Sequence, residues 1–262
     1  MQIKYYYLIN IQYLGFRFHG WQKQEGLKTV HSMIDRTVKF ILKHDDFKTL
    51  GTSRTDAMVS ANHSAFELFM NTPIDEESFV DDMNLYLPSD IKIMSIEQVD
   101  KTFNIINTPR IKEYIYLFSF GQKNHPFTAS IMESFTFDLD LELMKEGAKL
   151  FQGEHNFRKY CTKPSEKTKF KREILVSEIV ENDIFSANFF PEKSYIFKVS
   201  SEGFMRNQVR LMMGQLFELG KGNITLDDLK NSIAENADTS HFKYIASASG
   251  LTLYNVKFLE KK

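Results

Sequence analysis

The sequence has little cysteine and no long apolar run. Cys161 is the single cysteine among 262 residues, which excludes an intrachain disulfide and is typical of a reducing compartment. No uninterrupted apolar run approaches the roughly 20 residues of a membrane-spanning helix. The N-terminal stretch "MQIKYYYLINIQY" alternates and carries no signal-peptide pattern. We therefore expect a cytoplasmic protein without a membrane partner.

Metal and nucleotide motifs are also missing. The seven histidines lie far apart, and neither H-x-x-x-H nor C-x-x-C spacing occurs. Neither G-x-x-x-x-G-K-[ST] nor G-x-G-x-x-G is present, so the sequence signals no bound nucleotide cofactor. We expect a protein that uses no metal and no cofactor.

Charge is balanced overall but uneven along the chain. The net charge is −1, which by itself argues weakly against a nucleic-acid partner. Between Arg158 and Arg172, however, there are seven Lys or Arg residues and one Glu, whereas residues 75–82 hold five acids and no base. A solvated surface explains both runs as well as a binding site does.

Apolar periodicity predicts the elements of the first half in the order β-α-β-β-α-β. The first strand is marked by alternating apolar residues in 3–13, and Thr29 is the expected N-cap of the first helix. The remaining elements of this half are two strands at 47–54 and 62–70, a helix at 75–86 and a strand at 91–99.

The second half approximately repeats this order. A helix is expected from Phe204 to Leu219, ended by Gly220 and Gly222. The other expected elements are a strand at 112–120, a helix at 140–152, three strands within 173–201, a short helix at 225–234 and a last strand at 250–258. We predict an α+β fold of two similar halves, 1–106 and 107–262, each a mainly antiparallel sheet covered by helices, which form a central cleft.

The stretch "LGTSRTDAMVSANHSAFEL", residues 50–68, is the first candidate for a site. It places Arg54 and Asp56 among small residues between two expected strands. An aspartate in a turn is commonly an Asx-turn or a cap, and an Arg–Asp pair at a surface is common and weak. The small neighbours favour the second interpretation, in which a substrate approaches a carboxylate closely.

Several motifs in order resemble the TruA-type tRNA pseudouridine synthases over nearly the whole chain. They are "YLGFRFHGWQKQ", "TVHSMI", "GTSRTDAMVSA", "KEYIY", "LFQGEHNFRKYC", "GFMRNQVRLMMGQLFELGKG" and "SASGLTLYNVKF". Two of them, "GEHNFRKYC" and "NQVRLMMG", look closer to eukaryotic-style members that act in the anticodon arm. The resemblance implies isomerisation of uridine to pseudouridine at tRNA positions around 38–40, without cofactor or metal.

The resemblance also implies roles for five residues. Asp56 matches the essential aspartate, which acts as nucleophile or as base. Tyr114 matches the ring that packs against the target base, although a tyrosine on a strand is equally a core residue. Arg210 matches the basic residue that pairs with the aspartate. Arg54 matches an arginine that enters the RNA stem and assists flipping of the uridine. Leu251 matches an apolar residue that lines the pocket, although such a residue is equally a core residue.

The sequence departs from the family pattern at three positions. Met58 stands where the family usually has glycine, which costs energy if that position needs φ > 0. Arg206 and Asn207 stand where the bacterial form "HHMVR" has two histidines that face the RNA. The residues that carry the chemistry are present, so we expect an active enzyme whose site specificity is open.

A tRNA partner needs only a local basic surface, because tRNA is recognised largely by shape and by its phosphates. The resemblance further implies a homodimer whose tRNA spans both subunits. A catalytically silent tRNA-binding or folding factor and an α+β enzyme for a small molecule remain alternatives. The cations that are candidates for phosphate contacts are Arg17, Lys23, Arg158, Lys159, Lys163 and Lys167.

Overall fold

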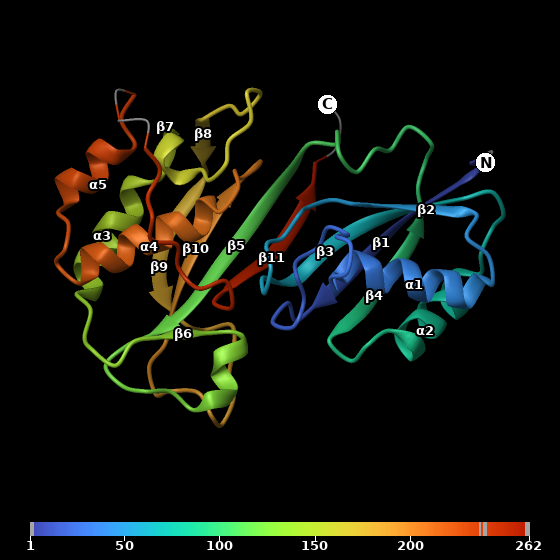
Figure 1. Cartoon of the computed structure of the whole chain (residues 1–262), viewed down its shortest axis with the longest axis horizontal. Helices are drawn as coiled ribbons and strands as arrows, with labels where there is room; N and C mark the ends of the chain where they lie inside the picture. Colours follow the sequence, from blue (N-terminus) through green and yellow to red (C-terminus); the bar gives the residue numbers. More distant parts are fainter. Residues whose placement is uncertain (1–2, 236, 238–239, 260–262) are drawn as a thin grey trace. The chain divides into compact units, whose positions relative to one another are not determined.

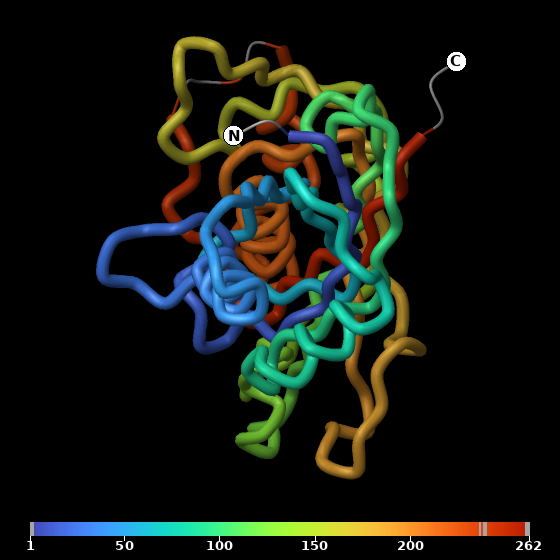
Figure 2. Tube along the Cα trace, turned by 90° about the vertical axis from the view of Figure 1, so that its right-hand side faces the viewer, coloured from blue at the N-terminus to red at the C-terminus, as the bar shows by residue number. Residues whose placement is uncertain are grey.

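The computed structural model describes residues 3–235, 237 and 240–259. These residues form two compact units, of which unit 1 runs to Arg110 and resumes at Leu253, and unit 2 comprises Ile111–Thr252. Figure 1 labels their helices and strands, and Figure 2 follows the chain from blue to red. Strands and helices are mixed in both, and almost all strand pairs are antiparallel, which confirms the predicted α+β class.

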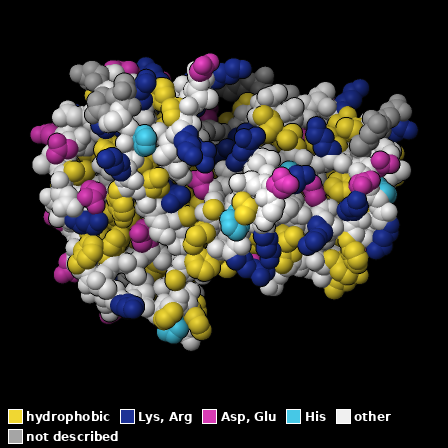
Figure 3. Space-filling model, in the orientation of Figure 1, with side chains coloured by type: hydrophobic (Ala, Val, Ile, Leu, Met, Phe, Trp, Pro, Cys, Tyr) yellow, Lys and Arg dark blue, Asp and Glu magenta, His cyan; other side chains and the backbone are white. Residues whose placement is uncertain are grey.

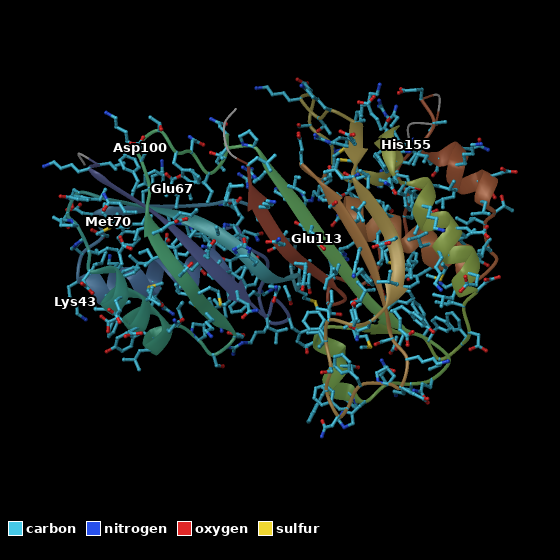
Figure 4. The ribbon with its side chains drawn as sticks, turned by 180° about the vertical axis from the view of Figure 1, so that it is seen from behind. Lys43, Glu67, Met70, Asp100, Glu113 and His155 are labelled. Atoms are coloured by element: carbon cyan, nitrogen blue, oxygen red, sulfur yellow. The ribbon has the colours of Figure 1, made fainter. Side chains whose placement is uncertain are left out.

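Unit 1 is built on antiparallel strands. Strand β1 pairs with β3 on one side and with β4 on the other. Strand β2 pairs with the C-terminal part of β3, from Phe66 to Met70. Figures 1 and 4 show α1 and α2 on the same face of this sheet. The last strand, β11, is hydrogen-bonded to β3. The bounds are β1 Tyr5–Tyr13, α1 Val30–Leu42, β2 Phe47–Gly51, β3 Ser60–Met70, α2 Glu76–Tyr86, β4 Ile91–Gln98 and β11 Leu251–Phe258.

Local signals explain where these elements begin. Thr29 caps α1 in a capping box, because its side chain accepts the N–H of Ser32 while the Ser32 side chain accepts the N–H of Thr29. Asp75 caps α2 by accepting the N–H of Ser78. In β1 the side chains of Ile9 and Ile11 are fully buried, as the alternation in this strand predicts.

Unit 2 contains the antiparallel strands β5-β10-β9, in that order, with the short β6 parallel to β5. Strands β7 and β8 form a separate two-stranded sheet. Helix α3 packs against β9 and against α4, and Figure 1 shows α3, α4 and α5 side by side. The bounds are β5 Arg110–Ser119, η1 Pro126–Ser130, β6 Glu133–Ser134, α3 Leu141–Leu150, β7 Gly153–Asn156, η2 Arg158–Tyr160, β8 Lys171–Ile174, β9 Val176–Glu181, β10 Tyr195–Ser201, α4 Gln208–Gly220 and α5 Leu226–Ser232.

Two sequence predictions about elements were wrong. The helix predicted from Phe204 begins at Gln208, because Asn207 takes a left-handed conformation with φ 60° and ψ 9°. Residues 205–208 form a turn instead, in which the N–H of Gln208 donates to the carbonyl of Met205 at 3.1 Å. The strand predicted over 47–54 ends at Gly51, so that Arg54 lies in a loop. Both corrections concern segments that carry candidate functional residues.

No helix in the described part of the chain is both long enough and apolar enough to span a lipid bilayer.

Candidate functional site

The candidate aspartate lies in the loop that joins β2 to β3. Asp56 is half-buried, its neighbour Thr55 is buried and Arg54 is exposed. This loop, residues 52–59, is held by its backbone: the N–H of Met58 donates to the carbonyl of Phe18 at 3.0 Å, and the carbonyl of Thr55 accepts the N–H of Trp21 at 3.2 Å. The backbone on both sides of Asp56 is therefore fixed to a second loop, residues 14–29.

Glycine and tryptophan explain why these two loops come so close. Gly20 has φ 83°, and a Cβ built there would lie 2.5 Å from the carbonyl oxygen of Thr55. Trp21 is buried and stacks on His31 at 5.5 Å between ring centroids. A Cβ on Gly51 would lie 2.3 Å from the indole of Trp21. The motif "GFRFHGWQKQ", residues 15–24, thus packs against the loop that carries Asp56.

Met58 occupies the strained position that the sequence comparison with the family singled out. Its φ is 66°, in the left-handed region that glycine enters without penalty. The hydrogen bond from Met58 to Phe18 is nevertheless formed, and the N–H of Val59 donates to the carbonyl of Asp56 at 3.2 Å. The turn from Asp56 to Val59 therefore forms with methionine at position 58, and the backbone of Met58 is strained as a result.

The two candidate phosphate-binding cations of the loop 14–29, Arg17 and Lys23, each pair with an acid. The guanidinium of Arg17 donates two hydrogen bonds to the carboxylate of Asp90, one of them 2.9 Å long. Lys23 forms an ion pair with Asp35. Their positive charge is therefore shared with acids, so unit 1 offers phosphates less basic surface than its sequence indicates.

Tyr114 and Leu251 are buried. Both belong to unit 2, since only the part of β11 from Leu253 onward belongs to unit 1. Tyr114 lies on β5, and its ring meets that of Phe204 edge-on at 5.3 Å. Glu113, the neighbour labelled in Figure 4, points to the opposite face of the sheet because side chains alternate along a strand. Leu251 begins β11, and its N–H donates to the carbonyl of Ala248.

Arg210 lies in the first turn of α4 and is held by its side chain. Its Nε donates to the carbonyl of Ala246 at 2.7 Å, and its guanidinium also donates to the side-chain oxygen of Asn207 at 3.3 Å. The N–H of Ala246 in turn donates to the carbonyl of Arg210 at 3.2 Å. The arginine is thus clamped between the N-cap residue of its own helix and the segment around Ala246.

A half-buried acid near Arg210 was not among the sequence predictions. Glu133, on β6, accepts hydrogen bonds from the hydroxyl of Tyr116 and from the N–H of Ser247. Burial raises the pKa of Glu133, while these hydrogen bonds and the positive charges of Arg210 and Lys221 act in the opposite direction. The motif "KEYIY" singled out Tyr114 but not Tyr116, whose partner Glu133 lies 17 residues away and leaves no local signal.

The predicted phosphate-binding residues of unit 2 lie on its surface. The ammonium of Lys159 is 5.1 Å from the ring centroid of Phe242. Lys163 is exposed and has φ 49°. Figure 3 shows basic and acidic side chains interspersed over one face of the molecule, in keeping with the near-zero net charge.

Comparison with known proteins covers both units. The profile of the tRNA pseudouridine synthase family matches residues 148–259. The chain is 30% identical over 253 residues to "tRNA pseudouridine synthase A 2" of Bacillus thuringiensis subsp. konkukian, a match that covers 96% of this chain and 99% of the relative. It is 31% identical over 252 residues to "tRNA pseudouridine synthase A" of Acetivibrio thermocellus, covering 95% of this chain and 97% of the relative.

These matches, together with the α+β fold and the aspartate loop, define the class of the protein as an isomerase, a pseudouridine synthase. Within that class, the chain belongs to the tRNA pseudouridine synthase A family. The family resemblance inferred from the ordered motifs is confirmed.

Proposed function

We propose that the protein converts uridine to pseudouridine in the anticodon stem-loop of tRNA, around positions 38–40. The relatives that match over their whole length carry tRNA in their names. The observation that carries the proposal is the loop of Asp56, which places a half-buried carboxylate on a backbone fixed by hydrogen bonds to Phe18 and Trp21. Such fixed placement is what acid–base or nucleophilic catalysis by a carboxylate requires.

The reaction rearranges one nucleotide without net gain or loss of atoms. The bond between N1 of uracil and C1′ of the ribose breaks, the base turns, and a bond forms between C5 and C1′. The proton on C5 leaves and N1 gains a proton. Asp56 takes part either as the nucleophile that carries the sugar or base between the two steps, or as the base that removes a proton.

Each of the other site residues has a role that its surroundings support. Arg210 supplies a guanidinium that orients a carboxylate, and its clamped side chain suits that role. Tyr114 and Leu251 supply apolar surface against which a uracil packs. Arg54 is exposed, as a side chain that enters an RNA stem must be.

Binding of tRNA is assigned to the basic residues of unit 2, among them Lys159 and Lys163, with Arg17 as a further contact. The variant Lys159→Ala with Lys163→Ala weakens tRNA binding in this proposal and lowers the salt dependence by roughly 0.9 per lost duplex phosphate contact. We also propose a homodimer, which the molar mass of the protein in solution with and without tRNA tests.

Release of tritium from C5 tests the proposed function directly. A tRNA transcript that carries tritium on C5 of uridine loses it to water when C5 joins C1′. The parent protein releases tritium in proportion to the pseudouridine formed. Binding of tRNA without tritium release would instead identify a catalytically silent tRNA-binding or folding factor.

A further inference from the structure

Unit 2 contains a basic pocket that the chemistry of uridine isomerisation does not use. It is a surface hollow of about 420 Å³. Ten residues line it; five carry a positive charge, and none is acidic. The five cations, which we call the cationic pocket, are Lys163, Lys167, Lys169, Arg172 and Arg206.

The walls of the cationic pocket are tied to one another. The N–H of Thr162 donates to the carbonyl of Arg206 at 3.3 Å, and the side chain of Asn207 donates to the hydroxyl of Thr162 at 2.7 Å. The N–H of Ser165 donates to the hydroxyl of Thr168 at 2.9 Å, which turns the lysine-bearing loop back toward β8. These contacts make the pocket a built feature of unit 2.

The positive charges of the cationic pocket are not neutralised within the described residues. None of its five cations forms an ion pair with an acid there, whereas the neighbouring Lys171 pairs with Glu154 at 2.9 Å. The Nε of Arg172 is buried and has no hydrogen-bond acceptor among the described residues. An unsatisfied buried donor costs roughly 1–3 kcal/mol, so a ligand that brings oxygen acceptors is favoured.

The cationic pocket is joined to the candidate catalytic arginine. Arg206 lines the pocket, and the next residue, Asn207, donates to the hydroxyl of Thr162 and accepts from the guanidinium of Arg210. Thr162 stands in the chain between two residues that line the pocket, 161 and 163. An anion in the pocket is therefore fixed relative to the first turn of α4.

We propose that the cationic pocket binds one backbone phosphate of the tRNA substrate, next to the strand that presents the target uridine to Arg210, and that this contact is independent of pH. This inference rests on the proposed function for the identity of the RNA. The guanidinium groups of Arg172 and Arg206 match the oxygens of a phosphodiester, and the three lysines add attraction without sequence preference.

The test is to measure the binding of an unmodified tRNA anticodon stem-loop by fluorescence anisotropy at several salt concentrations. For Arg206→Gln we expect about tenfold weaker binding and a salt slope smaller by roughly 0.7–0.9. Lys167→Gln, at an exposed position, shows a smaller loss in the same direction without a risk to folding. Lys193→Gln, an exposed lysine in another loop of unit 2, is the matched control and binds as the parent does.

A pH series separates this pocket from a generally basic surface. The other charged groups of the pocket are lysines and an arginine, residue types that do not ordinarily titrate between about pH 6 and 8, whereas histidine does. Burial raises the pKa of Cys161, which stays a neutral thiol. Arg206→His should therefore bind nearly as tightly as the parent at about pH 6 and resemble Arg206→Gln at about pH 8.

Parental affinity and salt slope in Arg206→Gln and Lys167→Gln would overturn the proposal, even if the parent releases tritium from C5. Weakened binding by both variants, with the parent inactive in tritium release, would keep the phosphate pocket and refute the proposed function. The two claims are thus separated by one binding and one activity measurement.

Discussion

The two units hold their candidate catalytic residues in different ways. Unit 1 places Asp56 on a loop whose backbone is bonded to a neighbouring loop through Phe18 and Trp21. Unit 2 places Arg210 on a helix and fixes its side chain by hydrogen bonds to Asn207 and to the carbonyl of Ala246. In unit 1 these bonds are made by the main chain of the loop, whereas in unit 2 they are made by the side chain of Arg210 itself.

This difference predicts different costs of substitution. A change of the Asp56 side chain leaves the backbone bonds of its loop in place, so we expect the loop to keep its conformation while the chemistry is lost. A change of Arg210 removes two side-chain hydrogen bonds and leaves the carbonyl of Ala246 without that donor, so it alters both chemistry and stability.

The variant Asp56→Asn should lose activity while keeping its fold. We expect the rate of tritium release to fall by about 10²–10⁴-fold, the range that a positioned carboxylate contributes as acid or base. Its melting temperature and its affinity for tRNA should stay near the parental values. Single-turnover kinetics and thermal unfolding measure both, and an active Asp56→Asn protein would refute the assigned role.

The variant Arg210→Ala should lose both activity and stability. We expect the free energy of unfolding to fall by roughly 1–3 kcal/mol, because a polar group loses its hydrogen-bond partner. Denaturant unfolding measures this loss, with Lys193→Ala as the control that removes an exposed cation from the same unit. Parental stability in Arg210→Ala would show that its side-chain bonds do not hold the segment around Ala246.

Each unit also contains an acid that is withdrawn from solvent, Glu67 buried and Glu133 half-buried, and these two differ in their surroundings. Glu133 has Tyr116, Ser247 and two positive charges near it. Glu67, labelled on β3 in Figure 4, accepts the N–H of Ile105 at 3.2 Å, and its other oxygen is buried without a partner among the described residues. Burial raises the pKa of Glu67 from its ordinary value of 4.5.

The raised pKa of Glu67 gives a pH-dependent prediction for unit 1. The folded state keeps this proton to higher pH than the unfolded state does, so the contribution to stability is present below about pH 4.5 and is lost as the pH rises through the raised pKa. Glu67→Gln should therefore be more stable than the parent at neutral pH, by on the order of 1 kcal/mol. The gain should shrink toward pH 4.5, and a gain that is constant with pH would contradict this account.

The smallest effect is expected at Met58. Glycine relieves the left-handed strain but makes the unfolded chain more flexible, so Met58→Gly should stay within about 1 kcal/mol of the parent. The sharper comparison is Met58→Gly with Met58→Ala, because alanine keeps the strain and loses the side chain. The glycine variant should be the more stable of the two by about 1 kcal/mol in denaturant unfolding. Equal stability would show that φ at this position carries no cost.

Much of the fold follows from local sequence signals. Alternation marked β1, and the pattern from Thr29 onward marked the first turn of α1, because capping and burial act over a few residues. The start of α4 did not follow, since the left-handed Asn207 is set by its bond to Thr162, 45 residues earlier. The strand β7 was missed because four residues with few apolar side chains give no period.

The candidate site divides in the same way. Asp56 and Arg210 stand in motifs that are visible in the sequence. Met58 stands in the same motif as Asp56, and the structure gives it a positive φ. The half-buried Glu133 and the assembly of Arg172 with Arg206 did not follow, because each joins segments that are distant in the chain. Their proximity depends on tertiary packing, which no local pattern encodes.

The central claim is that this chain forms pseudouridine in the anticodon arm of tRNA and needs Asp56 to do so. The most direct test is to incubate unmodified tRNA with the parent protein and with Asp56→Asn, and to map pseudouridine by chemical probing at nucleotide resolution. The account predicts pseudouridine at one or more of positions 38–40 with the parent and none with the variant. Pseudouridine confined to another part of the tRNA, or formed equally by Asp56→Asn, would contradict it.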